Sequence, residues 1–357
     1  MKSVVVIEPG RVQVVEVPKP EPGPYQALVR TEIAALCNAT DAKLVAGHFP
    51  GVDRYPLALG HESAGIVEAV GGKVRAFQIG QRAIGGLMFD FPGTQLASGW
   101  GGFCEYTLVN DHDAMDADGV ADPAHGWLEV FEIQRPVPAD IPPESAVLLC
   151  TWREVLAAFA DFRLKPGDDV TIFGAGPVGM SFVKLGRLFG LGYIGVVDPL
   201  EAKRASALAM GATEAFPPDA PELRELTKRR GRPVDAAIDA VGSEKIANAG
   251  LDLIGMGGSL CIYGVIAEPT VTLQKHRAPY NFDIYVHQWP TRWRERAAME
   301  PLCRWIGQGK LRWEEFVTHE FNLAQVQDAL AVSASGRSLK VLLRFAAPVE
   351  RTQRIER

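Results

Sequence analysis

The stretch DDVTIFGAGPVGMSFVKLGRLFGLGYIGVVD, residues 168–198, decides the fold of this chain. It opens with a short β-branched and aromatic run at 170–173, which predicts a buried strand. A glycine-punctuated turn follows, and apolar residues then recur at helical spacing from 180 to 189. A second apolar run at 193–197 predicts another strand, which ends on Asp198. The order strand, helix, strand indicates a βαβ unit of a parallel sheet.

The turn between this first strand and the helix suits the phosphates of a dinucleotide. Gly174 permits a tight turn, Gly176 leaves room for the pyrophosphate, and Gly179 lets helix and strand approach closely. The helix N-terminus offers unpaired N–H groups and partial positive charge. Asp198 lies where a carboxylate can accept from ribose hydroxyls, which a βαβ unit without a ligand would leave unexplained. The residues predicted to contact the cofactor are Gly174, Gly176, Pro177, Val178, Gly179, Asp198 and Lys203.

Composition narrows the classes of protein and partner. A chain of 357 residues suggests two domains, and 47% apolar with 22% charged residues is ordinary for a soluble globular protein. The net charge of −6 argues against nucleic acid or an anionic membrane as the main partner. We find no signal-peptide pattern and no apolar run near the roughly 20 residues of a membrane span. Five scattered cysteines do not suggest a disulfide framework, so we expect a cytoplasmic protein.

The rest of the chain divides into two kinds of pattern. Up to about residue 145, short β-branched runs alternate with Pro/Gly turns, which predicts a small barrel-like β domain. From 168 to 265 strands and helices alternate, which predicts a doubly wound parallel sheet with helices that include 220–229 and 246–254. Residues 266–296 lack a clear period, and we expect an irregular segment or a helix start there.

A metal site is suggested by three short segments that lie far apart. Thiolates from Cys37 and Cys150 and an imidazole from His61 would give three ligands and leave a tetrahedral position open, as a catalytic Zn²⁺ requires. Glu62 can act as a fourth or an exchangeable ligand. A cysteine among apolar residues is more often a core residue, and a His-Glu pair at a strand edge is usually solvated. Spacing alone therefore leaves the metal undecided.

Four segments, in this order and separation, resemble the zinc-dependent medium-chain alcohol/polyol dehydrogenases: Cys37, LGHESAGIVEAVG (59–71), GAGPVG (174–179) and VVD (196–198). The most specific part is YPLALGHESAGIVEAVGGKV followed by GQRA, and the resemblance covers nearly the whole chain. It implies an α/β protein in which a GroES-like β-barrel domain carries zinc and a Rossmann domain carries a nicotinamide. We expect the catalytic domain at 1–145, completed by 297–357, and the Rossmann domain at 146–296.

The resemblance carries over residue by residue. Cys37 matches the first zinc ligand, and His61 with Glu62 matches the second ligand and its neighbour. Cys150 lies where members place a further Cys or acidic ligand. The usual pattern in the family is C-x-[ST]-D. Here the segment Cys37-Asn38-Ala39-Thr40-Asp41 is one residue longer. Thr40, the candidate proton relay, is therefore shifted by one position relative to the family pattern.

Two further departures concern the surroundings of the site. Many members carry a four-cysteine lobe for a structural zinc near residues 85–110, where this chain has only Cys104, so we expect no such zinc. After Cys150 come a bulky Trp152 and the charged Arg153-Glu154, which we expect to crowd the nicotinamide pocket or to shape the substrate site. Asn38, Trp100, Glu105 and Trp289 are further candidates for lining a polar substrate pocket.

The expected reaction is the oxidation of an alcohol. The substrate would take the open zinc position, which acidifies its hydroxyl, and give a hydride to the nicotinamide. Thr40, or a water on Glu62, would pass the proton out. Asp198 favours NAD over NADP because a carboxylate repels the extra phosphate, although Lys203 and Arg204 keep NADP open. Polyols, sugars and cyclitols are all compatible with a polar substrate pocket, and the sequence singles out none of them.

Two other functions stay open at this point. One is a zinc-free quinone or enone reductase of the same superfamily, and the other is a non-catalytic NAD(P)H-binding protein. By analogy with the family, we expect a homodimer or homotetramer that forms through the sheets of the nucleotide domains.

Overall fold

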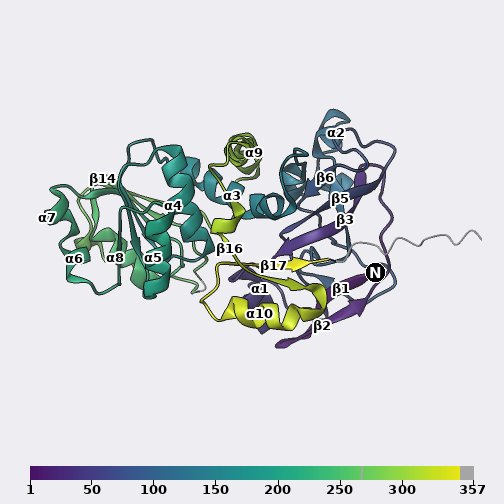
Figure 1. The fold of residues 1–357 in the computed structure, drawn as a ribbon, viewed down its shortest axis with the longest axis horizontal. Helices are drawn as coiled ribbons and strands as arrows, with labels where there is room; N and C mark the ends of the chain where they lie inside the picture. The colour runs from purple at the N-terminus through teal and green to yellow at the C-terminus, as the bar shows by residue number, and fades with distance from the viewer. Residues whose placement is uncertain (267, 346–357) are drawn as a thin grey trace, which may run out of the picture. The chain divides into compact units, whose positions relative to one another are not determined.

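The structure is a computed structural model that describes residues 1–266 and 268–345. The chain forms two compact units, the first built from Met1–Val147 together with the segment that starts at Thr318, and the second from Leu148–Val317 (Figure 1). Residues 297–317, which the sequence analysis assigned to the catalytic domain, group with the second unit. The part of the predicted domain beyond 345 lies outside the described residues. No described helix combines the length and apolar character needed to span a bilayer.

The second unit contains a six-stranded sheet in which all neighbouring strands are parallel. The strand order is β12-β11-β10-β13-β14-β15, so the winding direction reverses between β10 and β13. Such a switch point is where open α/β sheets bind ligands. The predicted doubly wound sheet is therefore present. Its strands are β10 (Val170–Phe173), β11 (Ile194–Val197), β12 (Glu214–Phe216), β13 (Val234–Asp239), β14 (Ile254–Ile262) and β15 (Phe282–Val286).

Helices connect these strands. The helix of the opening motif, α4 (Pro177–Phe189), has Pro at its first turn, and Gly190 ends it in a left-handed conformation. Its buried Phe182 stacks on Phe159, with ring centroids 5.5 Å apart. The other helical segments are α3 (Pro143–Asp161), α5 (Glu201–Met210), α6 (Pro221–Arg224), α7 (Leu226–Arg230), α8 (Glu244–Leu251), η3 (Lys275–Arg277), α9 (Arg292–Gly307) and η4 (Trp313–Glu315).

Three elements of this unit differ from the sequence prediction. The helix expected at 220–229 is two short helices that meet at Glu225. The helix expected at 246–254 starts earlier and ends at Leu251, because Ile254 already begins β14, whose glycines resemble a helix stop. The segment 266–296 contains the edge strand β15, whose apolar residues are largely exposed and so give no clear period.

The first unit contains two sheets. One has the order β2-β1-β4-β7, and the other has the order β16-β17-β3-β5-β6-β9, with β8 also paired to β3. The strands are β1 (Lys2–Glu8), β2 (Arg11–Glu16), β3 (Gln26–Ala35), β4 (Leu57–Ala58), β5 (Ser63–Val70), β6 (Arg82–Ile84), β7 (Ala97–Ser98), β8 (Tyr106–Asn110), β9 (Arg135–Pro136), β16 (Val317–Asn322) and β17 (Lys340–Arg344). The helical segments are α1 (Thr40–Ala46), α2 (His112–Ala117), η1 (Pro123–His125), η2 (Glu129–Ile133), η5 (Leu323–Gln325) and α10 (Val326–Ala334).

The end of the described chain returns to the core of the first unit. Val4 and Leu36 share one buried cluster with Val341 and Leu343 of β17. Strand β17 runs antiparallel to β3, with Leu342 opposite Ala35. The C-terminal segment, which was expected to complete the first domain, therefore places the start of β17 beside the end of β3 (Figure 1).

Candidate active site

The pairing of β3 with β5 brings two distant sequence motifs together. Cys37 follows the end of β3, and His61 and Glu62 immediately precede β5. Because the strands are antiparallel, the end of one lies beside the start of the other, with Ala34 opposite Ser63. The Ala35 N–H donates to the Glu62 carbonyl at 3.0 Å, so the ladder continues to the His-Glu pair.

Gly60 fixes the backbone that carries His61. Its φ is +101°, a left-handed conformation that side chains rarely adopt. A Cβ at this position would lie 2.2 Å from the Phe103 ring, which is fully buried. The glycine before His61 is therefore required by packing and by backbone conformation.

Cys37, His61 and Glu62 form a mixed group of donors. One ligand atom from each lies within 4.8 Å of the others, and Glu62 is buried whereas Cys37 and His61 are partly exposed. The Nδ1 atom of His61 is buried and has no hydrogen-bond partner among the described residues. Sulfur, imidazole nitrogen and carboxylate oxygen are the donors that Zn²⁺ uses in proteins. The residues present therefore fit a zinc ion.

Asp41 supports this group, although the sequence analysis assigned it no role. Its Oδ2 accepts from the Cys37 N–H at 2.8 Å, and its Oδ1 lies 3.6 Å from Nδ1 of His61. Burial raises the pKa of Asp41 to about 7, against the opposing effect of His61. Thr40 starts α1 one position earlier, and its hydroxyl has no partner within the described chain. Asp41 therefore links the backbone of Cys37 to the neighbourhood of His61. Thr40 as a relay stays a prediction.

Lys340 forms a buried ion pair with Glu62. Its Nζ lies 2.6 and 2.7 Å from the two carboxylate oxygens, and both residues are almost fully buried. Lys340 reaches this place because it is the first residue of β17. The next residue, Val341, accepts a hydrogen bond from the Leu36 N–H through its carbonyl oxygen, which holds the start of β17 beside the end of β3. The two residues are 278 positions apart, so no local pattern pairs them; the only signal is a lysine that opens an apolar strand.

Trp100 borders the donor group on one side. Its ring centroid lies 5.5 Å from that of His61 and 5.5 Å from that of Phe49. Two other candidate lining residues are engaged elsewhere, since Asn38 accepts from Ser333 and Glu105 accepts from the backbone N–H of Lys2. Trp289 belongs to the second unit and is 54% exposed.

Cys150 and its neighbours belong to the second unit. Cys150 is buried on α3, and its part in metal binding stays a prediction. Trp152 is buried against Phe316, with ring centroids 5.2 Å apart, so it is a core residue of this unit. Whether Trp152 crowds the nicotinamide pocket or shapes the substrate site stays a prediction.

The glycine turn has the geometry that the sequence indicated. Gly174 has a φ of +97°, and a Cβ on Gly179 would lie 1.8 Å from the Gly174 carbonyl oxygen, so strand and helix are in close contact. A Cβ on Gly176 would meet nothing within 4 Å. Pro177 and Val178 begin α4 directly behind this open space. The N-terminus of α4 is therefore accessible to a phosphate group.

Asp198 connects β11 to this turn. Its carboxylate accepts from the Ala175 N–H through Oδ2 and from the Leu200 N–H through Oδ1, each at 2.8 Å. Arg204 donates to the carbonyls of Asp198 and Pro199, which makes it a structural residue of the loop. Lys203 precedes it on α5 and is partly buried. Ribose contacts by Asp198 and Lys203 stay predictions.

Two family profiles match this chain. Residues 23–119 match the alcohol dehydrogenase GroES-like domain, and residues 177–295 match the zinc-binding dehydrogenase family. A sorbitol dehydrogenase from Halalkalibacterium halodurans is 25% identical over 94% of this chain and 96% of its own length.

Solved structures show the same fold. The NADH complex of a short chain alcohol dehydrogenase from Escherichia coli CFT073 has a TM-score of 0.78 at 20% identity and covers 97% of this chain and 99% of its own. A protein described as a zinc-binding dehydrogenase from Sinorhizobium meliloti 1021, bound to NADP, has a TM-score of 0.78 at 23% identity, with coverage of 96% and 98%. The predicted fold class, a Rossmann sheet with a GroES-like domain, is confirmed, and the chain belongs to the zinc-dependent medium-chain dehydrogenase family.

Proposed function

We propose that this chain interconverts a secondary alcohol of the polyol, sugar or cyclitol class and its ketone by hydride transfer, with zinc and NAD as cofactors. The observation that carries the proposal is the group of sulfur, nitrogen and oxygen donors from Cys37, His61 and Glu62 within 4.8 Å. The sorbitol dehydrogenase relative supports the polyol class of substrate.

In this proposal, Cys37, His61 and Cys150 would hold the metal, with Glu62 as a fourth or exchangeable ligand. When bound, the zinc supplies Lewis acidity that makes a substrate hydroxyl more acidic. The Asp41 carboxylate lies 3.6 Å from Nδ1 of His61, and it is the kind of neighbour that orients a ligating histidine. Cys37 would have to be deprotonated to act as a ligand, because the thiolate is the metal-binding form of cysteine.

The proton of the substrate hydroxyl needs a path away from the metal. We assign this role to Thr40, at the start of α1, or to a water held by Glu62. The ammonium of Lys340 contacts both oxygens of Glu62 and balances its charge, which keeps that carboxylate in place beside the donors.

The glycine turn is the proposed binding site of NAD. The open space at Gly176 and the N-terminus of α4 suit the pyrophosphate, and Pro177 and Val178 form the first turn behind it. Asp198 is proposed to face the ribose, where its negative charge disfavours the phosphate of NADP. Lys203 is a further proposed contact. A nicotinamide held there would supply the hydride acceptor.

The protein is proposed to act in the cytoplasm as a homodimer or homotetramer. All five cysteines are free, as is common in a reducing compartment. Strand β15 is an edge of the parallel sheet and exposes Ile284 and Val286, which are 44% and 63% accessible. An exposed apolar edge strand is suited to pairing with a second copy.

The test is a panel of secondary alcohols, polyols and sugars, followed by the nicotinamide absorbance with NAD and with NADP. The proposal expects turnover that is lost on chelation and restored by zinc. Turnover of quinones or enones that survives chelation would indicate the zinc-free reductase instead. Thermal stabilisation by NADH without turnover of any alcohol, quinone or enone would indicate a non-catalytic protein.

A further inference from the structure

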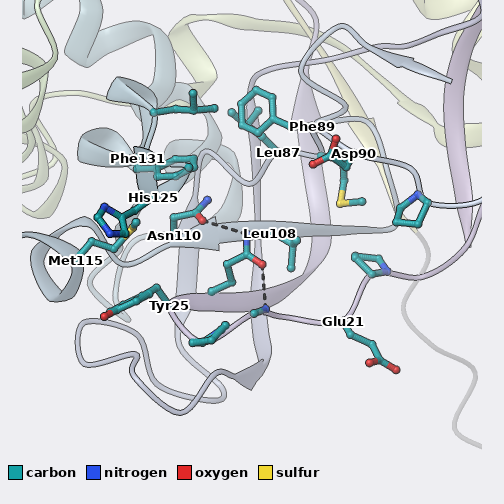
Figure 2. A pocket seen from close by; sticks show the side chains of 18 of the residues that line it. Glu21, Tyr25, Leu87, Phe89, Asp90, Leu108, Asn110, Met115, His125 and Phe131 are labelled. Carbon is teal, nitrogen blue, oxygen red and sulfur yellow. Dashed lines mark hydrogen bonds between the residues drawn. The ribbon is translucent and has the colours of Figure 1, made fainter. Parts of the chain in front are cut away.

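A pocket of about 740 Å³ lies in the first unit, apart from the donor group (Figure 2). Its walls come from residues 18–26, from the loop 87–92, from β8 and from residues 115–131. None of the metal donors lines it. Pockets of about 300–1,000 Å³ are the usual size for small molecules.

The pocket is mainly apolar. Leu87, Met88, Met115 and Phe131 are buried and form part of its lining, together with four prolines. Such a surface gains free energy when a ligand covers it, at about 25 cal/mol per Å².

The amide side chains of the pocket are already paired. Gln26 donates to Asn110 at 3.1 Å and accepts from the Gly23 N–H at 2.9 Å (Figure 2). Asn110 also donates to Gln134 at 3.0 Å. These groups therefore do not require a polar ligand.

The cationic side chains nearby are engaged with partners of the chain itself. The Lys19 ammonium lies 3.5 Å from the Tyr106 ring centroid and 3.6 Å from a Glu68 oxygen. The His125 ring lies 3.0 Å from the Asp122 carboxylate. The two cationic side chains of the lining, Lys19 and His125, therefore each have an anionic neighbour.

The rings of Phe89 and Phe131 and the carboxylate of Asp90 have no oppositely charged or cationic partner among the described residues. The centroids of Phe89 and Phe131 lie 6.5 Å apart with their planes inclined by 53°. Among the described residues no cation covers either ring, and the exposed Asp90 carboxylate makes no hydrogen bond or ion pair. Figure 2 shows Asp90 beside Phe89 and Leu87, whereas the carboxylate of Glu21 points away from the other labelled side chains.

We propose that this pocket binds an organic ammonium ion with an apolar body. The faces of aromatic rings attract cations, and the adjacent Asp90 supplies the opposite charge. The buried Leu87, Met88 and Met115 receive the apolar body. The pocket thus combines a preference for a positive charge, at Asp90 and the two rings, with an apolar surface for the rest of the ligand.

The test uses the zinc-loaded full chain and two probes that differ only in charge. Benzyltrimethylammonium and its neutral isostere neopentylbenzene are titrated by ligand-observed NMR. We expect saturable binding of the cation, about tenfold tighter than that of the isostere. Equal affinities, or no saturable binding of the cation, would overturn the proposal.

Variants locate the binding. Asp90→Asn is expected to weaken the cation about threefold to tenfold, and Phe89→Leu about threefold, while neither changes zinc content or dehydrogenase turnover. Glu21→Gln is the matched control, since it removes an exposed carboxylate of the same rim that points away. A loss for Glu21→Gln as large as for Asp90→Asn would show a diffuse charge effect and overturn the assigned site.

Discussion

Lys340→Met tests whether a buried ion pair supports the donor group. In the folded chain the Lys340 ammonium lies 2.6 and 2.7 Å from the two oxygens of Glu62, away from water. Methionine keeps most of the side-chain length but removes the charge, so the buried carboxylate loses its counter-ion. Breaking a buried pair in this way costs about 3–5 kcal/mol of unfolding free energy.

Calorimetry of the zinc-free protein measures this cost. At about 2–4 °C per kcal/mol for a unit of this size, the melting temperature should fall by roughly 6–20 °C. Arg304→Met is the control, because the Arg304–Glu300 pair is largely exposed and its loss should cost no more than about 1 kcal/mol.

A double variant distinguishes the energy of the Lys340–Glu62 interaction from the effect of removing the lysine alone. Lys340→Met with Glu62→Gln removes both charges, so we expect it to be more stable than Lys340→Met alone. If Lys340→Met destabilises no more than Arg304→Met, or if the double variant loses the sum of the two single effects, the reasoning on this pair is refuted.

Three further predictions concern the cofactor turn and the thiols. Gly179→Ala should unfold at a lower temperature, because its Cβ would lie 1.8 Å from the Gly174 carbonyl oxygen. Gly176→Val has open space at its Cβ, so it should fold normally but lose NADH binding in a fluorescence titration. Asp198→Asn should lower the NAD-to-NADP ratio of kcat/KM by about tenfold, roughly 1.4 kcal/mol, and an unchanged ratio would remove Asp198 from cofactor choice. Burial raises the pKa of the Cys104 thiol to about 12, so iodoacetamide at pH 8 should spare it, while Cys37 should be labelled in the zinc-free protein and protected by zinc. Equal labelling of Cys37 with and without zinc would count against it as a ligand.

The sequence predicted those parts that depend on local pattern. The strand, glycine turn and helix at 170–189 follow from β-branched residues, three glycines and helical spacing, and each glycine has the predicted environment. The two halves of the donor group, Cys37 and His61-Glu62, were found as motifs because each lies at the end of a clearly patterned strand.

Contacts between side chains that lie far apart in the sequence could not be predicted from local patterns. Lys340 reaches Glu62 only through the pairing of β17 with β3, which depends on the whole first unit. Asp41 needed the turn of the loop after Cys37, and β15 escaped notice because an edge strand with exposed apolar residues lacks the alternation of a half-buried one. Patterns thus identify segments, and tertiary packing decides which of their side chains meet.

Whether Cys37 holds a catalytic metal is tested by the zinc content of the purified chain, measured by mass spectrometry for the unmodified protein and for two cysteine variants. We expect one zinc per chain in the unmodified protein. Cys37→Ser should lose both the zinc and turnover, whereas Cys104→Ser should keep the zinc, because the Cys104 thiol is buried against Ser3. Full zinc and full turnover in Cys37→Ser would contradict the claim that this thiol holds a catalytic metal.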